Sequence, residues 1–414
     1  MQFTTSLVVL SVLSTNVFAH PGHDIGEEIA ERAAYMQHAK KDLSHCSAKL
    51  KARGIDKSSV ARRAATVKES RKKRSIPEVY TDLRIADAPY MKARDVTEVL
   101  ADSHLSNTSY DSTTDASILF AGNSSCILSP EVTQGPYWVS GEYVREDLSE
   151  EQEGVELILD TQVIDVNTCE PVPAAYVEIW ACNSTGVYSG IVSSGNGDST
   201  DLSNLDKTFL RGLQPTDDEG VAKFTTIFPG HYTGRATHIH VLAHFNGTLH
   251  DNGTYSGGYV SHVGQLFFAQ DLISQVELTA PYNTNTQELK LNSADQILAE
   301  EAATVDPVVQ YSLLGSDVSS GVFGWIAFGI DLTNQQTLTA AATLYESGGV
   351  ASNSSGGMGG GPGGNHTGPP PSGSPPSGSA SASLPVGSAS TSSTSTVSSS
   401  ASASASAVVD ECEA

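Results

Sequence analysis

The sequence predicts an all-β protein: a β-sandwich core, preceded by a helical N-terminal segment and followed by a disordered tail rich in Gly, Ser and Pro. Three observations lead to this fold class. Short β-branched and aromatic runs alternate with turn residues across residues 101–346. No stretch of that part keeps a 3.6-residue apolar period. Residues 347–414 contain too few apolar side chains to build a core.

The chain begins with an apolar leader. Residues 1–19 are uncharged, carry an apolar run from Leu7 to Leu13, and end with small side chains at Val17 and Ala19. This pattern is typical of a secretory signal peptide, and the run is shorter than the ~20 apolar residues that span a bilayer. No later stretch is long and apolar enough for a transmembrane helix. We therefore expect a secreted, extracellular protein.

Residues 20–100 are polar and comparatively basic. Within EEIAERAAYMQHAKKDL, Ile29, Ala33 and Met36 recur at helical spacing, which predicts a helix in this partly helical region. The dibasic pair Lys73-Arg74 follows. It indicates either a processing site that releases a propeptide up to about residue 74 or the solvated basic end of a helix.

Residues 101–346 are expected to form the sandwich. The apolar runs are VELILDTQVIDV, AAYVEIWAC, VAKFTTIF, THIHVLAHF, GQLFFAQDLI and GVFGWIAFGIDL, and clusters such as DDEG and FPG separate them. The tail, residues 347–414, continues from Gly/Pro repeats into Ser/Thr/Ala repeats. Such a segment is typical of an O-glycosylated stalk or linker, which would associate the protein with a cell wall or matrix.

The charge balance restricts the partners. Lys+Arg number 23 and Asp+Glu 47, so the formal net charge is −24. A main partner of nucleic acid or an anionic membrane surface needs a basic protein surface, so both are excluded. Seven N-x-[ST] sequons indicate a glycoprotein: Asn107, Asn123, Asn183, Asn246, Asn252, Asn353 and Asn365.

Secretion would place the cysteines in an oxidising compartment. An oxidising compartment favours disulfides, but the sequence leaves their connectivity open, as it does the oligomeric state. No pair has the C-x-x-C spacing of a zinc site. The five cysteines are Cys46, Cys126, Cys169, Cys182 and Cys412.

The densest group of chemically useful side chains is FPGHYTGRATHIH. Residues two apart on a strand share a face, so His238 and His240 would present two imidazoles side by side, as a metal site requires. The alternative is one histidine in the core and the other on a turn.

Two tyrosines could complete such a site. Tyr232 lies on the turn before His238, and Tyr188 lies in GVYSG; both have glycine neighbours that let the backbone bend. A phenolate is a hard anionic donor, and together with imidazole it suits Fe(III) better than Zn or Cu(I). For either tyrosine, the alternative is packing in the core with its hydroxyl on a carbonyl.

Several motifs occur together, in order, between Cys126 and Phe268: GPYW, IWAC, GVYSG, FLRGLQPTDDEG, FTTIFPGHYTGRATHIH and GQLFF. This part of the chain resembles the intradiol ring-cleavage dioxygenases, most closely their secreted fungal members. The resemblance implies a β-sandwich that binds a non-haem Fe(III) through two tyrosinates and two histidines. By motif position these ligands are Tyr188, Tyr232, His238 and His240.

The resemblance also implies a function. Such an oxidoreductase cleaves catechol-type rings with O2 between the two hydroxyl-bearing carbons and gives muconate-type diacids, a step of aromatic compound catabolism. Tyr232 would be the base that takes a catechol proton, Arg235 would stabilise charge on the ring, and Gln265 falls in the family's glutamine position. Catechol, hydroxyquinol, protocatechuate and larger phenolics all stay open as substrates.

Two alternative functions are considered. TDDEGVAKFTTIFPGHYT also resembles non-catalytic, transthyretin-like secreted β-sandwich modules, which would need neither Tyr188 nor the H-x-H pair. A mature terminus at His20, with His23 nearby, could bind Cu(II). Copper binding there would leave the tyrosines unexplained.

Overall fold

The computed structural model describes residues 43–76, 96–102, 104–105, 125–127, 135–303 and 305–352, with the backbone alone for residues 125–127. All of them belong to one compact unit, Met1–Gly357. The predicted signal peptide, the expected helix around Ile29, the copper candidates at His20 and His23, and Cys412 lie outside the described residues, as does nearly all of the tail. Within the described part of the chain, no helix is long and apolar enough to cross a membrane.

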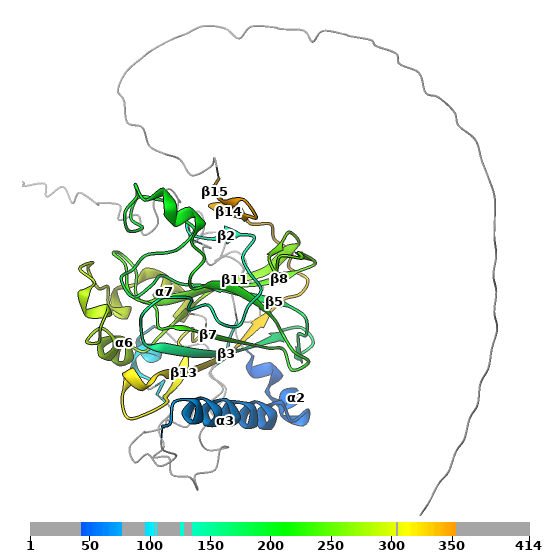
Figure 1. Cartoon of the computed structure of the whole chain (residues 1–414). Helices are drawn as coiled ribbons and strands as arrows, with labels where there is room; N and C mark the ends of the chain where they lie inside the picture. Colours follow the sequence, from blue (N-terminus) through cyan, green and yellow to red (C-terminus); the bar gives the residue numbers. More distant parts are fainter. Residues whose placement is uncertain are drawn as a thin grey trace, which may run out of the picture. The chain divides into compact units, whose positions relative to one another are not determined.

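Two sheets form the sandwich, which confirms the predicted fold class (Figure 1). In the first sheet β3 lies parallel to β13 and antiparallel to β7. The second sheet is antiparallel, in the order β11-β8-β5-β6. The first sheet contains β1 (Ser125–Ile127), β3 (Glu156–Asp165), β4 (Glu170–Pro171), β7 (Val221–Ile227), β12 (Gln310–Leu313) and β13 (Val322–Ile330). The second contains β5 (Tyr176–Trp180), β6 (Arg211–Pro215), β8 (His238–Phe245) and β11 (Tyr259–Phe267).

The remaining elements are short. One small sheet pairs β9 (Thr248–Leu249) with β10 (Tyr255–Ser256), and another joins β2 (Val139–Ser140), β14 (Ala342–Tyr345) and β15 (Gly348–Ala351). The predicted domain boundary after residue 346 falls between the paired strands β14 and β15. The helices are α2 (Ser47–Ala52), α3 (Ile55–Lys73), α4 (Val96–Ala101), α6 (Gln270–Val276) and α7 (Gln296–Ala302). Single 3-10 turns are η1 (Ser44–Cys46), η2 (Leu202–Asp206), η3 (Tyr282–Thr284), η4 (Asn292–Ala294) and η5 (Val318–Ser320).

Strand β8 shows how the core positions the site. Its residues Ile239, Val241 and Ala243 belong to the main apolar core, together with side chains of β3 and β13. Side chains alternate along a strand, so every second residue of β8 from His238, including His240, points to the opposite, outer face of the second sheet. Each large apolar side chain buried in the core stabilises the fold by about 1.5–3 kcal/mol. This burial fixes the register, and the register in turn fixes where the histidines point.

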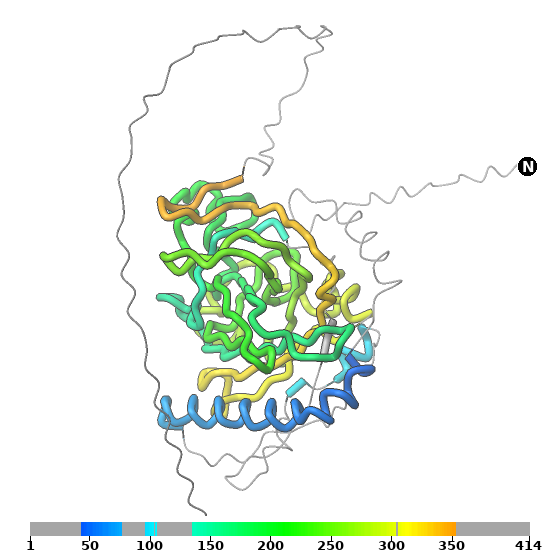
Figure 2. Tube along the Cα trace, turned by 90° about the vertical axis from the view of Figure 1, so that its right-hand side faces the viewer, coloured from blue at the N-terminus to red at the C-terminus, as the bar shows by residue number. Residues whose placement is uncertain are grey.

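The N-terminal helices cover the outer face of the first sheet. Helix α3 lies along this face beside β13, on the side of the molecule away from β14 and β15 (Figures 1 and 2). Val67 of α3 packs with Ile158, Phe323 and Trp325 of the sheet. The predicted processing pair lies at the end of α3, where the Arg74 side chain donates to the Ser320 carbonyl (2.6 Å). The described part of this region is thus largely helical, whereas the helix predicted around Ile29 lies outside the described residues.

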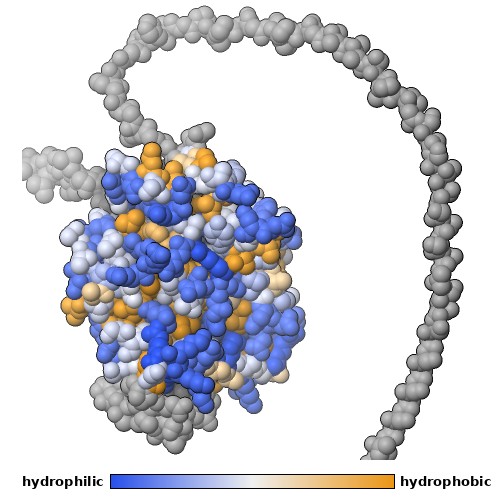
Figure 3. Space-filling view, viewed as in Figure 1, coloured by the Kyte–Doolittle hydropathy of each residue, from blue (hydrophilic) through white to orange (hydrophobic). Residues whose placement is uncertain are grey.

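A disulfide fastens these helices to the sandwich. Cys46, directly before α2, is bonded to Cys169, directly before β4, and both side chains are buried in the main core. Cys182 is a buried free thiol. Figure 3 shows a surface on which hydrophilic residues predominate and hydrophobic residues form small groups.

Candidate active site

The two histidines of β8 converge on one point. His238 and His240 are 2% and 1% exposed, and their Nε2 atoms lie 3.1 Å apart. Nδ1 of His238 donates to the Ala236 carbonyl (2.6 Å), which leaves the Nε2 lone pair free for a ligand. Burial, and then the nearby Arg235, lower the pKa of His238 to about 3, so its imidazole is neutral at physiological pH. His240 is held by stacking on Trp180, with ring centroids 4.7 Å apart.

The two predicted tyrosines lie beside these histidines. The Tyr232 hydroxyl is 3.4 Å from Nε2 of His238. The Tyr188 ring lies 5.5 Å from that of Tyr232 and 6.1 Å from that of His240, between centroids. The buried Tyr188 hydroxyl has no hydrogen-bond partner among the described residues. Burial raises the pKa of both phenols well above the ordinary value of tyrosine, so neither ionises unless a cation is bound beside it.

The backbone around each tyrosine is tightly held. Asn196 accepts from the Tyr188 backbone N–H (2.7 Å) and donates to its carbonyl (2.9 Å), and Asn204 donates to the same carbonyl (2.8 Å). On the Tyr232 side, a Cβ added to Gly230 would lie 2.5 Å from the Asn183 carbonyl oxygen. The glycine of FPG is therefore required for the close approach of two loops that positions Tyr232.

Arg235 and Gln265 form the polar edge of the site. Arg235 is 1% exposed and donates to Gln265 Oε1 (2.6 Å) and, through Nε, to Asp295 Oδ2 (2.9 Å). Asp295 also accepts from the backbone N–H groups of Ala236 (2.7 Å) and Leu298 (2.9 Å), so it caps α7 as well. Burial alone would raise the pKa of Asp295, but Arg235 and these hydrogen bonds lower it well below the usual range.

All six site residues predicted from the sequence thus gather in one place. The sequence reasoning missed the residues that hold them: Asp295, the two asparagines beside Tyr188, and Tyr137. The Tyr137 ring stacks on that of Tyr188, with centroids 4.8 Å apart, and meets that of Tyr232 edge-on at 6.2 Å. GPYW signalled Tyr137 as part of a motif but gave it no role. An Asp directly before an apolar helical run, as in ADQIL, is the capping signal that could have found Asp295.

The donor set fits a hard, highly charged metal ion. Two imidazole nitrogens point at one place, and a buried phenol whose hydroxyl lacks a hydrogen-bond partner among the described residues lies beside them. Two phenols whose pKa values are raised by burial can bind as phenolates only where a strong positive charge offsets that burial. Fe(III) meets this requirement and prefers such oxygen and nitrogen donors.

Residues 129–280 match the family model described as "Dioxygenase". An intradiol ring-cleavage dioxygenase from Tetranychus urticae is 30% identical; the match covers 98% of that protein and 51% of this chain, with a TM-score of 0.42. This chain belongs to the intradiol ring-cleavage dioxygenases. No curated protein matches it.

Two further solved structures are similar to this dioxygenase at lower identity. The dioxygenase domain of a carbohydrate-binding fusion protein from Streptomyces sp. SirexAA-E is 23% identical, with 95% of that domain and 48% of this chain covered and a TM-score of 0.29. Catechol 1,2-dioxygenase from Pseudomonas arvilla C-1 is 17% identical, with 64% and 50% covered and a TM-score of 0.31. Family membership confirms the predicted enzyme class, so the transthyretin-like alternative is set aside.

Proposed function

We propose that this dioxygenase binds one non-haem Fe(III) through Tyr188, Tyr232, His238 and His240. With it, the enzyme would cleave catechol-type rings between the hydroxyl-bearing carbons, using O2, to give muconate-type diacids. One observation carries the proposal: two histidine Nε2 atoms 3.1 Å apart face a tyrosine hydroxyl 3.4 Å from one of them. The family shares the reaction class, whereas the metal and the ligand set are our inference.

Ferric iron bound there would withdraw electron density from a chelated catecholate and make the ring reactive toward O2. The protein's own groups supply the proton transfer and the positioning. Tyr232 is the better candidate for the base because it holds the position before the H-x-H pair that the family resemblance assigns to the base, and its hydroxyl lies 3.4 Å from Nε2 of His238. On catechol binding, the Tyr232 phenolate oxygen would take a hydroxyl proton from the substrate.

Arg235 would act as an oriented positive charge. Asp295 and Gln265 hold its guanidinium in one plane at the edge of the site. A cation fixed in this way stabilises negative charge that develops on the ring without having to reorganise. The aromatic side chains of Tyr137 and Trp180 would exclude water from the reacting groups.

We also propose that the protein is secreted and glycosylated, as its leader and sequons indicate. Of the three described sequons, Asn246 and Asn252 are exposed, whereas Asn183 is half-buried and its side-chain nitrogen, the atom that would carry a glycan, donates to Gln152 (3.1 Å). We therefore expect glycans at Asn246 and Asn252 rather than at Asn183. Glycopeptide mass spectrometry of the secreted protein would test this.

The proposed function is tested with the full-length, iron-loaded protein. We expect about one iron per chain, a broad visible tyrosinate-to-iron absorption band, and O2 uptake with at least one of catechol, hydroxyquinol and protocatechuate. The double variant His238→Ala/His240→Ala should lose the iron and the band. The matched control, His250→Ala, removes an exposed histidine that contacts Ser256 and should retain both. Full iron content in the double variant would refute the ligand assignment.

A further inference from the structure

A second pocket lies on the same face of the second sheet as the proposed metal centre. Its volume is ≈ 140 Å³, and Leu213, Glu178 and His244 line it from three neighbouring strands, β6, β5 and β8. None of the four proposed metal ligands lines it. His244 is four residues beyond His240 on β8, about 13 Å along a strand at ~3.3 Å per residue. The pocket is therefore separate from the metal centre.

The pocket contains buried polar atoms that lack partners. Glu142 and Glu178 line it and are 1% and 2% exposed. Both carboxyl oxygens of Glu142, and Oε1 of Glu178, have no hydrogen-bond partner among the described residues. A buried carboxyl oxygen without a hydrogen bond destabilises the folded protein. Such oxygens at a pocket therefore indicate a place for bound water or a ligand.

Glu178 is held in position for such a ligand. Its Oε2 accepts from Nε1 of Trp138 (3.0 Å) and from Nε2 of His244 (2.6 Å), and these bonds leave Oε1 available. The rest of the lining includes aromatic rings, small hydroxyls, aliphatic side chains and glycines. Tyr255 stacks on Tyr176, with centroids 4.2 Å apart, and its hydroxyl accepts from the Gly247 N–H (2.8 Å), so its ring is fixed as a wall.

The charges favour a neutral ligand. No Lys or Arg lines the pocket, so nothing there would attract a carboxylate or phosphate. Arg211, behind the pocket, lies 3.9 Å from Glu142 Oε1. Burial raises the pKa of Glu142 to about 8, so at neutral pH this carboxyl is protonated and can both donate and accept hydrogen bonds. Oε2 of Glu178 is already bonded to Trp138 and His244, so Oε1 is the oxygen of this carboxyl that remains for a ligand.

A metal ion is disfavoured for the same pocket. Among the residues that the structure describes, the group of three metal-binding side chains with ligand atoms close together is His45, Cys46 and Cys169. It lies elsewhere, and its two cysteines form the disulfide. The pocket is also smaller than the ~300–1,000 Å³ of sites for drug-sized ligands, so its occupant is small.

We propose that this pocket is a second binding site, for a small neutral ring compound that carries several hydroxyl groups, of the size of one sugar unit or one phenol ring. Its hydroxyls would bond to Glu178 Oε1 and to the Glu142 carboxyl, and its ring would pack against Trp138 and Tyr255. Binding sites with aromatic walls and a few fixed polar groups hold small ring compounds in this way. A sugar and a phenol share this chemistry, and the experiment below separates them.

The test uses the full-length protein and ligand-observed NMR, which detects weak binding and does not depend on turnover. The probes are methyl hexopyranosides for the sugar and resorcinol for the phenol, because the non-adjacent hydroxyls of resorcinol do not chelate a metal. Thr337→Trp would fill the exposed mouth of the pocket, and Glu178→Gln would weaken the fixed acceptor. The matched control is Gln335→Trp, an exposed neighbour that does not line the pocket.

We expect saturable binding of one probe class, weakened at least about tenfold by Thr337→Trp and by Glu178→Gln but unchanged in Gln335→Trp. The class that binds identifies the source of the ligand. Thr337→Trp changes an exposed side chain, so it stays informative if Glu178→Gln fails to fold. Resorcinol binding that survives Thr337→Trp would belong to the metal centre and would overturn the proposal. If neither probe class binds, the proposal is also overturned, but the dioxygenase assignment is not affected.

Discussion

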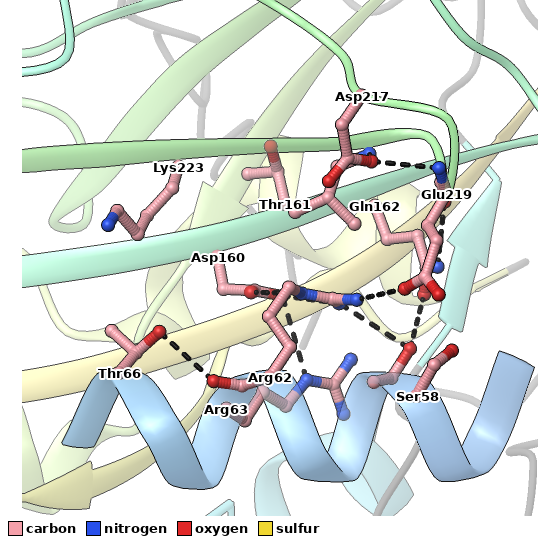
Figure 4. A network of polar contacts seen from close by, with 12 residues as sticks. Ser58, Arg62, Arg63, Thr66, Asp160, Thr161, Gln162, Asp217, Glu219 and Lys223 are labelled. Atoms are coloured by element: carbon pink, nitrogen blue, oxygen red, sulfur yellow. Dashed lines mark hydrogen bonds and ion pairs between the residues drawn. The ribbon is translucent and has the colours of Figure 1, made fainter. Parts of the chain in front are cut away.

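The outer faces of the two sheets differ in whether their buried polar groups have hydrogen-bond partners. On the first sheet, Asp160 of β3 is fully buried and accepts two hydrogen bonds from Arg62 of α3, which also donates to Glu219 (2.9, 3.2 and 2.9 Å; Figure 4). On the second sheet, the buried hydroxyl of Tyr188 and the carboxyl of Glu142 have no hydrogen-bond partner within the described residues. A fold usually satisfies its buried polar groups. We infer that the paired face stabilises the protein and that the unpaired face binds ligands.

The largest effect is expected from the two tyrosines that we propose as metal ligands. Tyr232→Phe removes the proposed base and one anionic donor but leaves Tyr188 and both histidines. A positioned general base is typically worth about 10²–10⁴-fold, and we expect turnover to fall on that scale while iron and some colour remain. Tyr188→Phe should instead weaken iron binding itself, because Tyr188 stays bound throughout.

Visible spectra with catechol bound anaerobically distinguish the two tyrosines. In the wild type and in Tyr232→Phe, the residual protein band should come from Tyr188. If the band persists in Tyr188→Phe and is absent from Tyr232→Phe, the two roles are reversed.

A smaller effect is expected from Asp295, which touches neither the proposed metal nor substrate. Asp295→Asn removes the counter-charge of buried Arg235, and breaking a buried pair in this way costs about 3–5 kcal/mol. Turnover should fall because the guanidinium loses its orientation, while the tyrosinate band should remain. Unchanged turnover in a folded Asp295→Asn variant would show that Arg235 needs no such support.

The same carboxyl gives a pH dependence with a definite sign. The pKa of Asp295 is lower in the folded protein than its unfolded value of about 3.9. Its contribution to stability is therefore present above the unfolded pKa and is lost as the pH falls toward the folded pKa. We expect the wild type to lose stability more steeply below about pH 4 than Asp295→Asn does. Urea unfolding at several pH values would measure the difference.

Local patterns predicted the strands and the metal-ligand candidates but not their supports. His238 and His240 could be placed on one face because the strand period is two, and the glycines around Tyr188 and Tyr232 marked bends. Asp295 lies 60 residues from Arg235 in the chain, and Cys46 lies 123 residues from Cys169. A local sequence period cannot predict contacts between residues so far apart in the chain. The pocket beside Glu178 is lined by residues of several strands and connecting segments that are far apart in the sequence, and only the fold brings them together.

On the first sheet the expected effect is on stability alone. Asp160→Asn removes one of the two charged acceptors of Arg62, the other being Glu219, and hydrogen bonds to charged groups are worth about 1.5–3 kcal/mol. The free energy of unfolding should fall by about that amount. Iron content, the visible band and turnover per folded molecule should stay as in the wild type. A changed band would mean that the helix-covered face is coupled to the site, against the division between the two faces.

The smallest effects are expected from shortening the C-terminal part, where two cuts give a matched pair. Residues 353–414 are expected to add no core, so a chain ending at Ser352 should keep the wild-type melting temperature and activity. A chain ending at Glu346 also loses β15, and with it the bond from the Gly349 N–H to Asp206 (2.9 Å).

Asp206 closes the turn η2, and Asn204 of that turn donates to the Tyr188 carbonyl (2.8 Å). The shorter chain should therefore have a slightly lower melting temperature and bind iron somewhat less tightly. The reason is that Asp206, two residues after Asn204, loses its bond to Gly349, so the turn that holds Tyr188 is less well supported. Thermal unfolding and iron competition with a chelator would measure both effects. If the two cuts behave alike, β15 does not support the site, and the boundary at residue 346 suggested by the sequence is adequate.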